Sequence, residues 1–117
     1  MAALTAQALT ADFSVAPQLD PGAMAWAAHA GFKSVINNRP DFEGGPDQPT
    51  SAEIETAAHA AGLRYAHLPV SPMMQTPQEI AQFAQLLADL PKPILAFCRS
   101  GTRSGNLYRA SVRPAGG

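Results

Sequence analysis

Short apolar segments alternate with amphipathic segments along most of the chain. Four segments have the length and apolar content of buried strands, at residues 13–16, 32–37, 63–70 and 94–97. The clearest amphipathic helix carries apolar residues one turn apart, namely Ile80, Phe83, Leu87 and Leu90. Strands that alternate with helices predict right-handed crossovers between parallel strands. The pattern therefore predicts an α/β domain with a parallel sheet of about four strands flanked by helices.

Helix boundaries are marked by residues with known capping preferences. Asp20 followed by Pro21 predicts a first helix that ends at Gly31. Two later segments carry the pattern of a capping box, Thr50 with Glu53 and Thr76 with Glu79. A last helix is expected over residues 104–112.

Length and composition limit the organisation of the chain. With 117 residues and 46% hydrophobic content, we expect one domain over residues 1–117, frayed at 1–11 and 113–117. The net charge of −1 gives no general attraction to nucleic acid or to an anionic membrane. Apolar runs are too short to span a bilayer, so we expect neither nucleic acid nor membrane as a partner.

The cysteine count indicates a reducing compartment. One cysteine excludes an intramolecular disulfide, and the N-terminus lacks the pattern of a secretory signal, so a cytoplasmic location is expected. Three scattered histidines and one cysteine do not have the spacing of metal ligands. We therefore expect no metal and no cofactor.

The chemistry concentrates in residues 98–104, Cys-Arg-Ser-Gly-Thr-Arg-Ser, directly after the last predicted strand. Inward backbone amides and the positive end of the next helix form an anion cradle in such a loop, where a thiol is expected to exist largely as thiolate. Cys98 is the predicted nucleophile. Arg103 is the predicted anion clamp because its fork of donors matches phosphoryl or sulfuryl oxygens, although it could instead tie the loop to neighbouring carbonyls.

The other residues of this loop have supporting interpretations. Gly101 permits a backbone turn that would strain other residues. Three hydroxyls can bond the thiolate or cap the next helix, those of Ser100, Thr102 and Ser104. Arg99 is expected to point out of the loop toward substrate or solvent.

A second group of polar residues follows an earlier strand, at residues 37–43, Asn-Asn-Arg-Pro-Asp-Phe-Glu. Arg39 could hold an anionic donor, and Asp41 or Glu43 could move protons or orient Arg39. The same residues are also good turn formers, and for Glu43 we favour that structural interpretation. In parallel sheets ligands bind beyond the carboxyl ends of the strands. We therefore expect the site among the loops at 38–49, 71–76 and 98–103.

From Leu63 onward the sequence resembles a dual-specificity phosphatase domain, with an apolar strand that leads into Cys98-x-x-Gly101. That resemblance implies a histidine before the cysteine, an arginine after five intervening residues and an aspartate as general acid. The chain departs on each count. Phe97 precedes the cysteine, Arg103 follows after four residues, and residues 71–76 contain no carboxylate. Loss of a general acid commonly lowers the rate by about 10²–10⁴-fold.

The six-residue loop of residues 98–103 also resembles the active-site loop of rhodanese-type sulfurtransferases. That resemblance implies a ring of amides sized for a cysteine persulfide. Thiolate Cys98 would take the sulfane sulfur of an anionic donor such as thiosulfate and pass it to a thiol, cyanide or sulfite. Sulfur transfer needs no protonated leaving oxygen, so the missing acid does not impair it.

The motifs at residues 37–41 and 98–104 together resemble the phosphatase-like domain of beta-lactamase hydrolase-like proteins, over about residues 12–112. This resemblance implies a tyrosine-phosphatase-like fold with about four parallel strands. It also implies a site around Cys98 and Arg103, with Arg39 and Asp41 as further members. Relatives can be fused to sulfide-handling enzymes, so a sulfide-oxidising partner enzyme is one expectation.

The main hypothesis is a rhodanese-like sulfurtransferase that uses a small anionic sulfur donor. The first alternative is a cysteine-dependent phosphatase that hydrolyses a phosphoester, and the second is a non-enzymatic module that binds an anion or a partner protein. The predicted catalytic residues are Cys98, Arg103 and Asp41. The predicted substrate-binding residues are Arg99, Ser100, Gly101, Thr102, Ser104 and Arg39.

Overall fold

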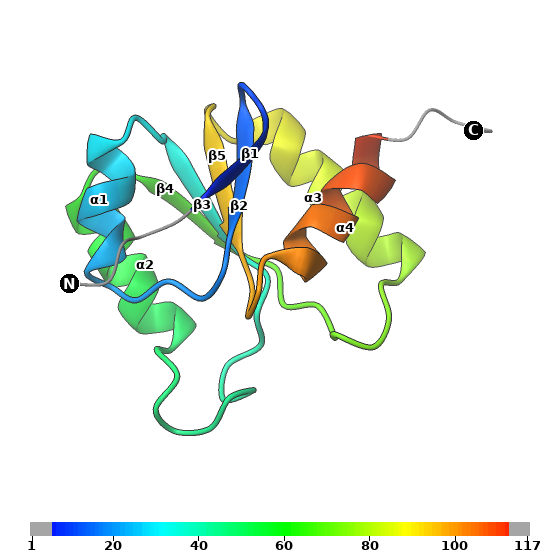
Figure 1. The fold of residues 1–117 in the computed structure, drawn as a ribbon, viewed down its shortest axis with the longest axis horizontal. Coiled ribbons are helices and arrows are strands. Elements are labelled where there is room, and N and C mark those ends of the chain that lie inside the picture. The colour runs from blue at the N-terminus through cyan, green and yellow to red at the C-terminus, as the bar shows by residue number, and fades with distance from the viewer. Residues whose placement is uncertain (1–5, 113–117) are drawn as a thin grey trace.

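A computed structural model describes residues 6–112 as a five-stranded sheet with helices on both faces (Figure 1). The strands are β1 (Gln7–Thr10), β2 (Phe13–Ala16), β3 (Ser34–Asn37), β4 (Arg64–His67) and β5 (Ile94–Phe97). The helices are α1 (Ala23–His29), α2 (Ser51–Ala60), α3 (Pro77–Asp89) and α4 (Thr102–Val112). This is the expected α/β arrangement.

The strand order β1-β2-β5-β3-β4 places β5 at the centre of the sheet. Strand β5 pairs in parallel with β2 on one side and β3 on the other, and β3 pairs in parallel with β4. The four parallel strands are those that the hydrophobic pattern predicted. Because Cys98 directly follows β5, it lies at the middle of the sheet's carboxyl edge.

A fifth strand, β1, corrects the expectation that residues 1–11 are frayed. It pairs antiparallel with β2 through a tight turn in which the Asp12 amide donates to Thr10 Oγ1 at 3.1 Å. Leu9 packs against the apolar cluster beneath it, so this edge strand is held by both pairing and burial. The remaining residues expected to fray, 1–5 and 113–117, lie outside the described part of the chain.

Both predicted capping boxes are confirmed. The hydroxyl of each threonine accepts from the amide three residues on, and the glutamate there accepts from the threonine amide, for Thr50 with Glu53 and for Thr76 with Glu79. Helix α1 begins at Ala23 instead of Pro21, with Asp20 Oδ1 accepting from the Ala23 amide at 2.9 Å. Helix α4 begins at Thr102, two residues before the predicted start.

Strands β3 and β4 begin later than predicted because the first apolar residues of these segments close the preceding helices, and β4 also ends at His67, three residues before its predicted end. The Phe32 amide donates to Ala27 O at 3.1 Å, and the Leu63 amide donates to Ala58 O at 2.8 Å. These residues are apolar because they pack against the core, not because they are paired in the sheet. Hydrophobic pattern alone does not separate the two roles.

The two faces of the sheet carry separate cores. Helices α1 and α2 pack over one face, and α3 and α4 pack over the other, as Figure 1 shows. Alternate residues of β5 enter the two cores: Leu95 and Phe97 join the first, and Ile94 and Ala96 the second. Burial on both faces fixes β5 rigidly and so fixes the position of Cys98. Among the described residues, no helix has the length and apolar character to cross a bilayer.

Candidate active site

The three loops expected to share one edge of the sheet do meet there, at the lower end of the strands in Figure 1. One cavity of about 430 Å³ has a floor at Cys98 and a wall from the segment 71–75. A second cavity of about 520 Å³ is lined by Arg39, Glu43, Gly44, Pro72, Arg99, Ser100 and Arg103. Pro72, Ser100 and Arg103 line both cavities, so the two hollows adjoin.

Cys98 lies at the bottom of the first cavity with 1% of its surface exposed. The Gly101 amide donates to Cys98 Sγ at 3.0 Å, so the loop directs a backbone dipole at the sulfur. Gly101 has φ of 93°, and a Cβ there would lie 3.4 Å from the main chain of Ala16. Glycine is therefore required for this turn. Helix α4 starts at the next residue and adds the positive end of its dipole.

Arg103 is buried with one edge of its guanidinium already bonded. Nη1 donates to Glu43 Oε2 at 3.1 Å and to Val70 O at 3.0 Å, and Nη2 donates to Glu43 Oε1 at 3.1 Å. Nε is buried and has no partner among the described residues. The Nε–H and the second hydrogen of Nη2 point along the same edge of the planar group. Neither of these two donors has a partner within residues 6–112, and their spacing matches two oxygens of an anion.

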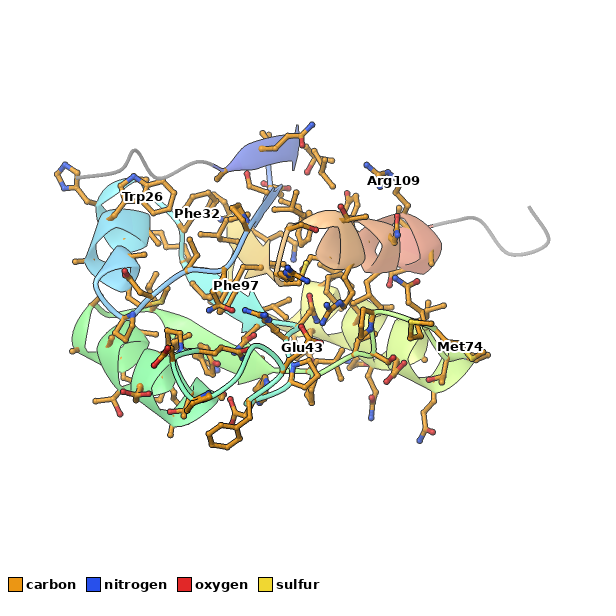
Figure 2. All side chains as sticks on the ribbon, turned by 60° about the horizontal axis from the view of Figure 1, so that its bottom comes forward. Trp26, Phe32, Glu43, Met74, Phe97 and Arg109 are labelled. Carbon is orange, nitrogen blue, oxygen red and sulfur yellow. The ribbon has the colours of Figure 1, made fainter. Side chains whose placement is uncertain are left out.

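Glu43 has a larger role than the turn formation that the sequence analysis favours. It forms the contact with Arg39 that was the alternative interpretation, with Arg39 Nε donating to Glu43 Oε1 at 2.8 Å, and it also pairs with Arg103, which the sequence did not predict. Although the main chain of Glu43 is at the surface, only 20% of its side chain is exposed. Figure 2 shows Glu43 near the middle of the face formed by the loops. The four-residue spacing from Arg39 was the only local signal for this role.

Arg39 is held beside the second cavity by its neighbours. Nη1 donates to Gln18 Oε1 at 3.1 Å, and the Arg39 amide donates to Asn37 Oδ1 at 2.9 Å. The carbonyl of Arg39 lies 2.9 Å from His67 Nε2, which donates to it. Arg39 is only 8% exposed, so these bonds hold a buried cation at the wall of the site.

Asp41 is not brought to the cysteine. Its Oδ1 accepts from the Ser51 amide at 2.7 Å, at the first residue of α2. Asp41 lines neither of the two cavities described above. The structure thus gives this carboxylate a helix-capping contact and no contact with Cys98 or Arg103 that would serve catalysis.

The hydroxyl groups of the Cys98 loop form hydrogen bonds with other side chains of the protein. Ser104 Oγ donates to Asn38 Oδ1 at 2.9 Å, so this serine connects α4 to the strand β3 exit instead of bonding the sulfur. Ser100 Oγ donates to Thr102 Oγ1 at 3.2 Å, and both residues are exposed at the cavity rim. Arg99 is also exposed at that rim.

The ion pairs of Glu43 make stability depend on pH. Burial works to raise the pKa of the Glu43 carboxyl, but hydrogen bonds and charge from Arg103 and Arg39 outweigh it and hold the pKa below its ordinary value of 4.5. A lowered folded-state pKa gives stability that is fully present above 4.5 and is lost as the pH falls through the folded-state pKa.

Glu43→Gln is therefore expected to lower the free energy of unfolding by about 2 kcal/mol at neutral pH, because two buried guanidiniums lose their counterion. The difference from the unmodified protein should shrink as the pH falls below 4.5 and through the lowered folded-state pKa of Glu43, as measured by urea unfolding. Asp47→Asn makes the same charge change on the surface of the same loop and serves as the control. A difference independent of pH would contradict the assigned ion pairs.

Sequence comparison relates this chain to larger proteins. Residues 5–115 match the family of the beta-lactamase hydrolase-like protein, phosphatase-like domain. A beta-lactamase hydrolase-like protein from Agrobacterium fabrum is 45% identical over 78 residues, which cover 67% of this chain and 18% of that protein. A second from Xylella fastidiosa is 39% identical over 84 residues, 72% of this chain and 19% of that protein. The matched region spans less than a fifth of these relatives.

Structural comparison confirms the tyrosine-phosphatase-like fold. A candidate phosphatase from Neisseria meningitidis has a TM-score of 0.82 at 31% identity, over 94% of this chain and 80% of that one. TpbA of P. aeruginosa, solved as a cysteine-to-serine variant with phosphotyrosine, has a TM-score of 0.64 over 89% of this chain and 67% of that one. Its 17% identity supports the fold alone.

The descriptions of these relatives name phosphatases and do not name sulfur transfer. They therefore favour the phosphatase alternative over the sulfurtransferase that the loop length suggested. By the match over residues 5–115, the chain belongs to the beta-lactamase hydrolase-like protein family, as its phosphatase-like domain.

Proposed function

We propose that this domain is a cysteine-dependent phosphatase that uses Cys98 as its nucleophile. The observation that carries the proposal is the free edge of Arg103, whose buried Nε has no partner in residues 6–112. Arg103 and Cys98 line the same cavity, so we expect an anion bound by Arg103 to come within reach of the sulfur. A buried donor without a partner is costly, and an oxyanion of the substrate would satisfy it.

The reaction follows from these positions. The Cys98 thiolate attacks the phosphorus of a monoester, the S–P bond forms, and the bond to the leaving oxygen breaks with its electron pair. Water then attacks the phosphocysteine, and the S–P bond breaks to release inorganic phosphate and the thiolate. The Gly101 amide, the start of α4 and Arg103 stabilise the charge on the equatorial oxygens in both steps.

The described residues offer no evident proton donor for the leaving oxygen. Residues 71–76 contain no carboxylate, Asp41 is bonded to the start of α2, and Glu43 is held ionised by two arginines. The domain should therefore prefer esters whose leaving group departs as a stable anion. Aryl phosphates meet that requirement better than alkyl phosphates.

One feature favours sulfur transfer as a second candidate function. Only four residues separate Cys98 from Arg103, and the small ring of amides matches a persulfide. A thiosulfate donor would release sulfite without protonation, so the lack of an acid is no disadvantage. Cys98 would then carry one sulfur atom to an acceptor thiol or cyanide.

The two functions are separated by assaying p-nitrophenyl phosphate and phenyl phosphate beside thiosulfate–cyanide exchange. We expect hydrolysis of both esters, with kcat/KM about tenfold lower for phenyl phosphate because its leaving group is more basic and unassisted. Exchange without ester hydrolysis would replace the phosphatase proposal with sulfur transfer. Neither activity would favour a non-enzymatic anion-binding module.

A further inference from the structure

The second cavity has a net positive charge, and two of its arginines lie outside the cavity that contains Cys98. Its charged lining consists of three arginines and one carboxylate, Arg39, Arg99, Arg103 and Glu43. Glu43 forms ion pairs with both Arg103 and Arg39. Within residues 6–112 Arg99 forms no ion pair, and it is exposed at the rim of this cavity. The cavity therefore retains two positive charges in excess.

Gln18 places Arg39 and Arg99 on the same wall. The Gln18 amide donates to the Arg99 carbonyl at 3.2 Å, while Gln18 Oε1 accepts from Arg39 Nη1 at 3.1 Å. The Nε and Nη1 groups of Arg39 therefore already donate hydrogen bonds, to Glu43 and to Gln18 respectively. No bond from Nη2 is formed with the described residues, which leaves it for a ligand. Arg99 contributes a long, exposed side chain from the Cys98 loop itself.

The second cavity is continuous with the reaction site but distinct from it. Pro72, Ser100 and Arg103 line both cavities, whereas Cys98 lines only the first and Arg39 and Arg99 only the second. A group seated above Cys98 uses the free edge of Arg103. A substituent of the same molecule that extends past Arg103 enters the hollow with the two remaining arginines.

We propose that Arg39 and Arg99 form a second anion subsite, so that the preferred ligands carry two anionic groups a few bonds apart. One is the phosphoryl group above Cys98, and the other is a second phosphate or a carboxylate. This proposal depends on the proposed function in one respect only, namely that the group bound above Cys98 is a phosphoryl group. Guanidinium groups bind both phosphate and carboxylate oxygens through paired donors.

The subsite is tested by calorimetric titration with methylphosphonate and with alkane bisphosphonates of increasing chain length, at one ionic strength. We expect at least one bisphosphonate to bind about tenfold tighter than methylphosphonate, the gain from one charge-assisted hydrogen bond. Arg99→Gln should remove most of that gain. Arg109→Gln, the same charge change at an exposed position on α4 outside this cavity, should keep it.

The ratio of the two affinities separates this proposal from the phosphatase proposal. Methylphosphonate affinity reports the cradle around Cys98, whereas the bisphosphonate ratio reports Arg39 and Arg99. A ratio near one at every chain length overturns the subsite even if esters are hydrolysed. An equal loss in Arg99→Gln and Arg109→Gln also overturns it, because general surface charge would then explain the gain.

Discussion

Cys98→Ser is expected to lower kcat/KM for p-nitrophenyl phosphate by about 10⁴-fold or more, to the background rate. Serine is close to cysteine in size, but its hydroxyl is a far weaker nucleophile and no base among the loop residues is placed to activate it. The Gly101 amide and the free edge of Arg103 remain in place. Substrate binding should therefore survive while the phosphocysteine cannot form.

Two measurements distinguish loss of chemistry from loss of structure. Urea unfolding should show similar stability for Cys98→Ser and the unmodified protein, and methylphosphonate should still bind in a calorimetric titration. Intact-mass spectrometry of the unmodified protein, quenched during turnover, should show one phosphoryl group on Cys98. Substantial hydrolysis by the serine variant would remove Cys98 from the mechanism altogether.

Much of the fold was predictable because local signals and tertiary packing agree. Thr50 and Thr76 mark helix starts by chemistry that acts within three residues, and both capping boxes form. Strand β5 was predicted because burial on both faces requires a continuous apolar run, and it supplies residues to both cores. Its central place puts Cys98, the residue that follows it, at the middle of the sheet's carboxyl edge.

Strand β1 was missed because its only apolar contact with the core comes from Leu9. Most of the strand is exposed, and its stability comes from antiparallel pairing with β2 and not from an apolar pattern. An exposed edge strand of four residues has little sequence signature. Predicting it requires knowing that β2 has an unpaired side.

The ion pair between Glu43 and Arg103 was not predicted, for a different reason. Arg103 lies 60 residues away in the chain, so the spacing of charges shows nothing of the pair. The sequence analysis favoured Asp41, two residues earlier, for the functional role, but the turn geometry brings Asp41 to the start of α2 and Glu43 to the arginines. A buried cation needs a partner, but sequence does not tell which carboxylate supplies it.

In the proposed mechanism we expect Glu43 to act as a positioning residue, because it fixes the orientation of the Arg103 guanidinium. The bidentate pair occupies the Nη1–Nη2 edge, and Val70 O takes the outer hydrogen of Nη1. The guanidinium cannot rotate without breaking these bonds, so its Nε edge is held in one orientation for the proposed reaction. A lysine has three donors on one nitrogen and cannot satisfy Glu43, Val70 and a substrate in the same geometry.

Arg103→Lys is therefore expected to lower kcat/KM for p-nitrophenyl phosphate by about 10³-fold, the loss typical of removing an oxyanion donor. Most of the loss should fall on kcat, because two paired donors stabilise the transferring phosphoryl group more than the bound ester. Arg109→Lys on the same helix keeps the charge and lies outside the Cys98 cavity, so it should retain full activity. A loss of less than tenfold in Arg103→Lys would mean that a point charge suffices and that the free guanidinium edge is not the anion clamp.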